Sequence, residues 1–105
     1  MQRITIDFLT EWKEERLQKL WDKRLETAEK IASAKCDFIA KDIKVDIERT
    51  SPDPDTQIFD DSVSAYQLYI RLCVAQNEIN KQIDTLIRIK TEYDLLNAYL
   101  EYGDD

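Results

Sequence analysis

Pairs of carboxylates three residues apart are the first feature of this sequence that could do chemistry. Glu11 and Glu14 form one pair, and Glu26 and Glu29 form another. On a helix the two members of such a pair are surface neighbours, and carboxylate oxygens are the ligands that Mg²⁺, Mn²⁺ and Ca²⁺ prefer. The sequence holds no His. This excludes a Ser-His-Asp triad, a Cys-His nucleophile, a helical zinc site with two His and a Glu-x-x-His di-iron site from this chain alone.

In size, helical content and paired acids, the chain resembles the all-α nucleotide pyrophosphohydrolases, in which carboxylates from several helices bind Mg²⁺. The resemblance implies a Mg²⁺-dependent enzyme that acts on nucleotides. The pattern of that family also needs a Glu-x-x-Asp on a later helix, and the nearest acids here, Asp84, Glu92 and Asp94, do not have that spacing. The resemblance therefore covers half of the motif.

Large aromatic residues are expected to gather where the two ends of the chain meet. Because Tyr and Trp dominate the energetics of protein interfaces, they are our candidate surface for a partner, although the same side chains could close the core. The set comprises Trp12, Trp21, Tyr93, Tyr99 and Tyr102.

Three polar residues interrupt the apolar repeat of the second half of the chain. Polar residues on a buried seam between helices set the register or the oligomeric state. They could also line a ligand pocket between subunits, and both interpretations stay open. These residues are Gln76, Lys90 and Asn97.

The elements that must position these side chains are helices. Of 105 residues, one is Gly and two are Pro, which is too few for the turns of an all-β fold and leaves no Gly-rich loop to cradle a phosphate. A chain of this length is expected to form one domain. We expect an extended arm or helix start at 1–8, a first helix at about 9–49, a Pro/Asp loop at 50–60, and a second helix at about 61–102 that Gly103 ends.

Two long helices joined by one loop predict an all-α antiparallel hairpin. In the second helix, apolar residues recur every seven positions from Leu72 to Leu100, which is typical of coiled-coil packing. Folding the chain about Pro54 and Asp55 places Cys36 level with Cys73. We expect two small buried thiols in a reducing compartment, with a disulfide as the alternative.

Both helices carry more apolar surface than one hairpin can bury. Two helices in contact cover one stripe each, so we expect self-association, most simply a two-fold dimer that forms a four-helix bundle. A larger oligomer or a different protein could complete the core instead. On the first helix the main stripe comprises Leu17, Trp21, Leu25, Ala28, Ala32, Cys36, Ile39, Ile43 and Ile47.

The negative charge lies in the second half of the chain. Residues 1–52 hold 11 basic and 11 acidic residues, whereas residues 53–105 hold 4 and 11, which accounts for the net charge of −7. An acidic chain repels phosphates, so direct nucleic-acid binding is not expected. The basic residues near Lys19 are interleaved with acids, as in the helical pairs Glu15–Lys19 and Glu26–Lys30.

These patterns predict a non-enzymatic, oligomeric helical protein that binds another protein as an inhibitor or adaptor. Small acidic helical proteins of this type include phage and mobile-element inhibitors of host enzymes. Capture of a nucleotide-like ligand between subunits is the first alternative, and an enzyme resembling the pyrophosphohydrolases is the second. No apolar run approaches the length of a membrane span, and the first residues lack a signal-peptide pattern, so a cytoplasmic protein without membrane contact is expected. We expect no catalytic residue, metal or cofactor.

Overall fold

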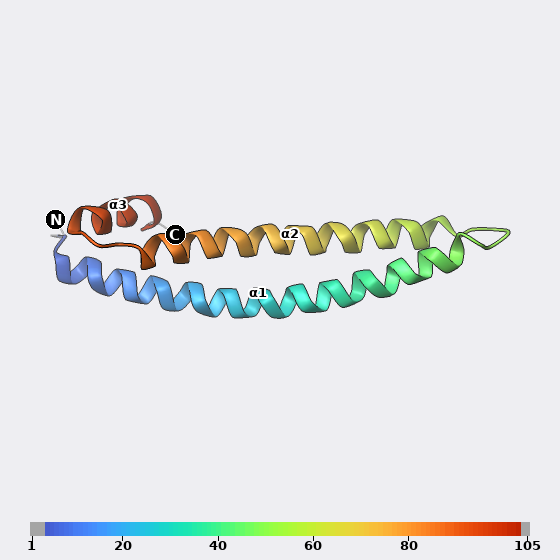
Figure 1. Cartoon of the computed structure of the whole chain (residues 1–105), viewed down its shortest axis with the longest axis horizontal. Helices are drawn as coiled ribbons and strands as arrows, with labels where there is room; N and C mark the ends of the chain where they lie inside the picture. The colour runs from blue at the N-terminus through green and yellow to red at the C-terminus, as the bar shows by residue number, and fades with distance from the viewer. Residues whose placement is uncertain (1–3, 104–105) are drawn as a thin grey trace. The chain divides into compact units, whose positions relative to one another are not determined.

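The structure is a computed structural model that describes residues 4–103. It contains three helices over this range, α1 (Ile6–Glu48), α2 (Thr56–Ile87) and α3 (Glu92–Tyr102) (Figure 1). Helices account for 86 % of the described residues, and no strand occurs among them. The predicted all-α hairpin of two long helices is confirmed. Within residues 4–103, no helix has an apolar stretch that could cross a membrane.

The chain divides into two compact units. Unit 1 comprises Met1–Leu25 and Glu78–Asp105, and unit 2 comprises Glu26–Asn77. The long helices α1 and α2 each contribute one segment to each unit, and α3 belongs to unit 1. In each unit, the segments of α1 and α2 pack against each other.

The inner faces of α1 and α2 follow a seven-residue repeat. On α2, the predicted heptad residues Ile79, Ile83 and Leu86 are buried. This spacing keeps one face of a helix turned toward its neighbour. On α1, from Leu20 to the end of the helix, the buried and half-buried positions alternate in steps of four and three, and they are Leu20, Arg24, Thr27, Ile31, Ala34, Phe38, Lys41, Val45 and Glu48.

The two units are filled by side chains of different size. In unit 1 the core consists mainly of large aliphatic residues, with Trp12, Leu17 and Ile89 packed against it. The buried residues of unit 2 are small or polar. The unit 1 cluster comprises Leu20, Ile79, Ile83, Leu86 and Ala98, and the buried residues of unit 2 are Thr27, Ala34, Val45, Ser62 and Ala65.

The prediction of one helix over 61–102 was wrong, because α2 ends at Ile87 and α3 begins at Glu92. Thr91 caps α3: its backbone is extended, and its hydroxyl accepts a hydrogen bond from the Asp94 N–H at 3.1 Å. The break lets α3 turn back beside the last turns of α2 (Figure 1), which buries Leu95 and Ala98. Burial of this apolar surface favours the broken form over one continuous helix.

The ends of the other helices are also capped. α2 begins at Thr56, earlier than expected, because the Asp55 carboxylate accepts a hydrogen bond from the Gln57 N–H at 3.0 Å. At the start of α1, the Thr5 hydroxyl accepts from the Phe8 N–H at 3.1 Å, so residues 6–8 are a helix start rather than an arm. Residues 1–3 of that prediction lie outside the described residues. Gly103 ends α3 as predicted, and its N–H donates to the Tyr99 carbonyl at 2.7 Å.

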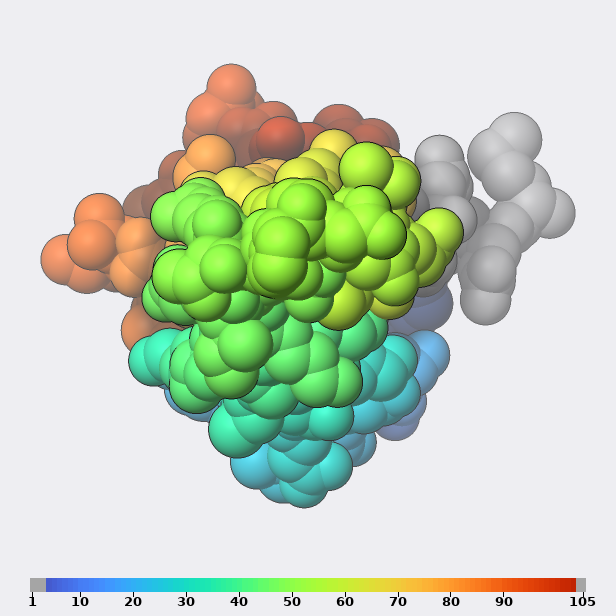
Figure 2. Space-filling view, turned by 90° about the vertical axis from the view of Figure 1, so that its right-hand side faces the viewer, coloured from blue at the N-terminus to red at the C-terminus, as the bar shows by residue number. Residues whose placement is uncertain are grey.

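The register of unit 2 differs from the predicted one. The Phe38 ring meets the Tyr66 ring at 5.1 Å between centroids and lies nearly parallel to the Tyr69 ring. The numbers of these facing residues add to 104 (38 and 66) and 107 (38 and 69), whereas a fold about Pro54 and Asp55 would give 109. The sums are lower because the connection between α1 and α2 is centred on Pro52. This connection faces the viewer in Figure 2. Cys36 is exposed and Cys73 half-buried, and both are free. The expected burial of the Cys36 thiol was therefore wrong.

Candidate binding surfaces

Three aromatic rings meet in unit 1. The Tyr99 ring contacts Trp12 edge to face at 5.3 Å and Phe8 edge to face at 5.5 Å between centroids. These three residues, with Glu11, Glu15 and Gly103, line a cavity of about 360 Å³. We call it the aromatic cavity. Its rings and two carboxylates are chemically suited to a cationic side chain, which is attracted both by ring faces and by negative charge.

The aromatic cavity is built by helix spacing and by the turn of α3. Phe8 and Trp12 lie four residues apart and are therefore neighbours on α1, and α3 brings Tyr99 to them. Gly103 also lines the cavity and lies very close to Tyr99. A Cβ atom at this position would meet the Tyr99 carbonyl oxygen and would lie 3.0 Å from the Tyr99 ring. Position 103 therefore accepts no side chain without a shift of Tyr99.

The structure brings together two of the five predicted aromatic residues, Trp12 and Tyr99. Trp21 is exposed, and the Arg24 guanidinium lies 5.1 Å from the centre of its ring. Tyr93 is 73 % exposed. Tyr102 is half-buried, and burial together with the nearby Glu101 carboxylate raises its pKa. Phe8 was missed, although its spacing of four from Trp12 could have identified it.

A second cavity, of about 500 Å³, lies in unit 1 between α1 and α2. Arg16, Lys19 and Lys23 line it, above an apolar floor of Leu20 and Ile79. The Arg16 guanidinium donates a hydrogen bond to the Gln82 side-chain oxygen at 3.1 Å. We call this cavity the basic groove. Its chemistry suits an anion that carries an apolar part.

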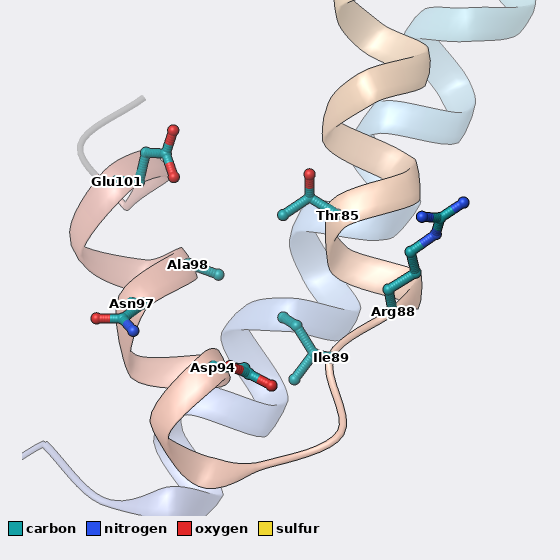
Figure 3. A pocket seen from close by; sticks show the side chains of 7 residues that line it. All are labelled: Thr85, Arg88, Ile89, Asp94, Asn97, Ala98 and Glu101. Atoms are coloured by element: carbon teal, nitrogen blue, oxygen red, sulfur yellow. The ribbon is translucent and has the colours of Figure 1, made fainter.

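The three polar positions predicted for the seam occupy different settings. Gln76 is half-buried on the inner face of α2 in unit 2. Lys90 and Asn97 are exposed, because the heptad of α2 ends at Ile87. Asn97 lines a cavity of about 230 Å³ between α2 and α3. In Figure 3, Ile89 and Ala98 point into the space between these helices, whereas Arg88 points away from α3.

The largest exposed apolar side chains of unit 2 lie on the outer faces of its helices. Four exposed apolar residues along one side of α2 form the outer α2 face, and Tyr66 from this face contacts the half-buried Phe38 ring. A row of exposed apolar residues on α1 forms the outer α1 stripe. The outer α2 face comprises Val63, Tyr66, Ile70 and Val74, and the outer α1 stripe comprises Ala28, Ala32, Cys36, Ile39, Ile43 and Ile47.

The paired carboxylates of α1 are exposed. Glu26 forms the predicted ion pair with Lys30 at 3.3 Å, while Glu11 lines the aromatic cavity without Glu14. Among residues 4–103, no three Asp, Glu or Cys side chains lie close enough together to hold a metal ion. Comparison with known proteins gives no family for the chain: no family model, no curated protein and no solved structure matches it.

Proposed function

We propose that this chain is a non-enzymatic helical protein that works as an oligomer and binds another protein, as an inhibitor or adaptor. One observation carries the proposal: the buried residues of unit 2 are small, such as Thr27 and Ala34, while many of its large apolar side chains are exposed. Ile43 is 55 % exposed and Ile47 66 %. Apolar surface contributes about 25 cal/mol per Å² when it is removed from water, and contiguous exposed patches mark interaction sites.

The aromatic cavity is the surface we assign to the other protein. It combines Trp12 and Tyr99, residue types that dominate binding energy, with the carboxylates of Glu11 and Glu15. A Lys or Arg side chain of the partner fits this combination, because it gains both a ring face and a charge-assisted hydrogen bond. The net charge of −7 also speeds the encounter with a basic surface.

Capture of the partner by two matched variants tests this assignment. Glu15→Lys reverses a charge in the aromatic cavity, whereas Glu14→Lys makes the same change one residue away, outside the cavity. A tagged chain should retain from cell extract a protein that Glu14→Lys also retains and Glu15→Lys loses. Both variants should keep the helical circular dichroism of the native chain. Equal retention by both, or equal loss, would contradict the assignment.

Self-association is tested separately by light scattering. Ile43→Glu places a charge on the outer α1 stripe. Leu100→Glu, on α3, is the control, because Leu100 is also exposed, at 67 %, but lies outside the stripe. We expect a dimer or larger oligomer for the native chain and for Leu100→Glu, and a lower mass for Ile43→Glu. A native chain that stays monomeric over the accessible concentration range would refute self-association.

The basic groove supports a second candidate function, capture of a nucleotide-like anion. Three cations above Leu20 and Ile79 offer charge for phosphates and an apolar surface for a base. ATP should then raise the melting temperature of the native chain more than inorganic phosphate does. Lys19→Ala should remove this effect, and Lys81→Ala, outside the groove, should keep it. The absence of any ATP shift in the native chain would refute this function.

A further inference from the structure

The outer α1 stripe has a different repeat from the inner face of the same helix. Its residues follow one another in steps of four, four, three, four and four, from Ala28 to Ile47. Positions 28 and 39, 32 and 43, and 36 and 47 are each 11 residues apart. An 11-residue repeat corresponds to about 3.67 residues per turn, close to the 3.6 of a straight α-helix, and helices that pack through such a repeat coil about each other with a slight right-handed twist. The stripe is therefore a second packing face for a helix.

The stripe is also graded by size. Its first half consists of Ala28, Ala32 and Cys36, and its second half of three Ile residues. The spacing of the stripe residues is the same when it is read from either end, so the stripe is symmetric about a point between residues 37 and 38. A second copy of the stripe, turned end for end about that point, places each small side chain opposite an Ile, which fills the space between two helices evenly. Two parallel copies would place Ile against Ile and Ala against Ala.

The charges beside the stripe match the same antiparallel arrangement. A two-fold axis places each flank of the stripe against the same flank in the other copy. On one flank, Lys35 then lies within one turn of Asp42 of the partner subunit. On the other flank, Glu29 lies within one turn of Lys44 of the partner subunit. Each of these opposite-charge pairs occurs twice.

The four flanking residues are available for such pairs. Lys35, Asp42, Glu29 and Lys44 are all exposed. Within residues 4–103 none of them takes part in an ion pair, although their neighbours do, as in Lys41–Asp37 at 3.1 Å and Arg49–Asp46 at 3.6 Å. The charge pattern therefore favours a second copy of this chain over an unrelated apolar partner.

We propose that the outer α1 stripe is the contact between two copies of the chain, which pair antiparallel about a two-fold axis level with residues 37 and 38. This inference rests on the self-association proposed above and adds the surface, the direction and the register. Ala28, Ala32 and Cys36 of one subunit pack against the Ile residues at 47, 43 and 39, respectively, of the other.

Cysteine cross-linking tests the register. Two single variants, Ala32→Cys and Ile43→Cys, are made in a chain in which both native cysteines are replaced by Ser. Each variant alone should stay uncross-linked under mild oxidation, because its thiol faces an apolar residue of the partner. A mixture of the two variants should form a covalent heterodimer, which non-reducing gels and mass spectrometry identify. A mixture of Ala32→Cys with Ile47→Cys is the matched control and should stay uncross-linked.

The outcomes separate this inference from the proposed function. Cross-linking of Ala32→Cys with itself means parallel pairing and overturns the inference. A mixture that does not cross-link, although light scattering shows a dimer, places the contact on another surface and overturns the inference alone. Monomeric protein in every sample overturns both the inference and the proposed self-association.

Discussion

Tyr99 contacts both the start of α1 and the end of its own helix, α3. Its ring contacts Phe8 and Trp12 from the first turns of α1, and its carbonyl accepts the N–H of Gly103. Edge-to-face ring pairs of this kind contribute about 0.5–1.5 kcal/mol each beyond the burial of their area. Tyr93, on the same short helix, is largely exposed, which makes the two tyrosines a matched pair for measurement.

Tyr99→Ala should destabilise the protein by about 2–4 kcal/mol, because it removes two ring contacts and leaves a cavity beside Trp12. Tyr93→Ala should change the free energy of unfolding by less than about 0.5 kcal/mol. Urea unfolding followed by circular dichroism measures both values. If the two variants unfolded at the same urea concentration, the aromatic contacts would not hold α3 to α1.

At the scale of the helix, the sequence predicted the inner face of α2 better than the end of α2. The seven-residue repeat through Ile79 and Leu86 is buried as expected, because burial depends on spacing, which a sequence displays. The end of α2 was missed because no Gly or Pro marks it. The signal of the break is weaker: Thr91 is followed three residues later by an acid, Asp94, which resembles a capping box. The break stabilises the fold only when Ala98 packs into a cluster with residues distant in sequence, such as Leu20.

Thr91→Ala should weaken α3 by about 1 kcal/mol, because the N–H of Asp94 loses the acceptor that caps the helix. Thr91→Ser keeps a hydroxyl at the cap and should restore most of the loss. The urea midpoint gives both free energies. If Ala and Ser at this position gave the same midpoint, the cap would not determine where α3 begins.

Charge reversal beside the outer α1 stripe tests the pairing of helices between subunits. Lys35→Glu should weaken the dimer about tenfold, because it places two acids together on each side of the axis. Asp42→Lys should weaken it by a similar factor, and the two changes combined should restore most of the affinity. Sedimentation at low and high salt measures the dissociation constants, and salt should reduce the differences. If the double variant lost as much dimer affinity as the two single variants together, the pairing would be contradicted.

At the scale of the whole molecule, the two units differ in what stabilises them. Unit 1 has its own aliphatic core and a third helix that covers it. The largest buried residue of unit 2 is Val45, and most of its Ile and Val side chains are exposed. The sequence predicted the excess of apolar surface on both helices, but not which stripe faces outward. That choice depends on how the two helices are rotated against each other, and their repeats alone do not define this rotation.

Unit 2 should therefore depend on self-association for part of its stability, whereas unit 1 should not. Association stabilises a folded state by mass action, and amide hydrogen exchange reports local opening. On dilution below the dissociation constant, the amides of residues 39–47 should exchange faster, while those of Ile79, Ile83 and Leu86 should keep their protection. Ile43→Glu should show the fast pattern at every concentration, because it prevents the contact that covers the stripe. Equal protection of both units at all dilutions would mean that the small core of unit 2 is sufficient without a partner.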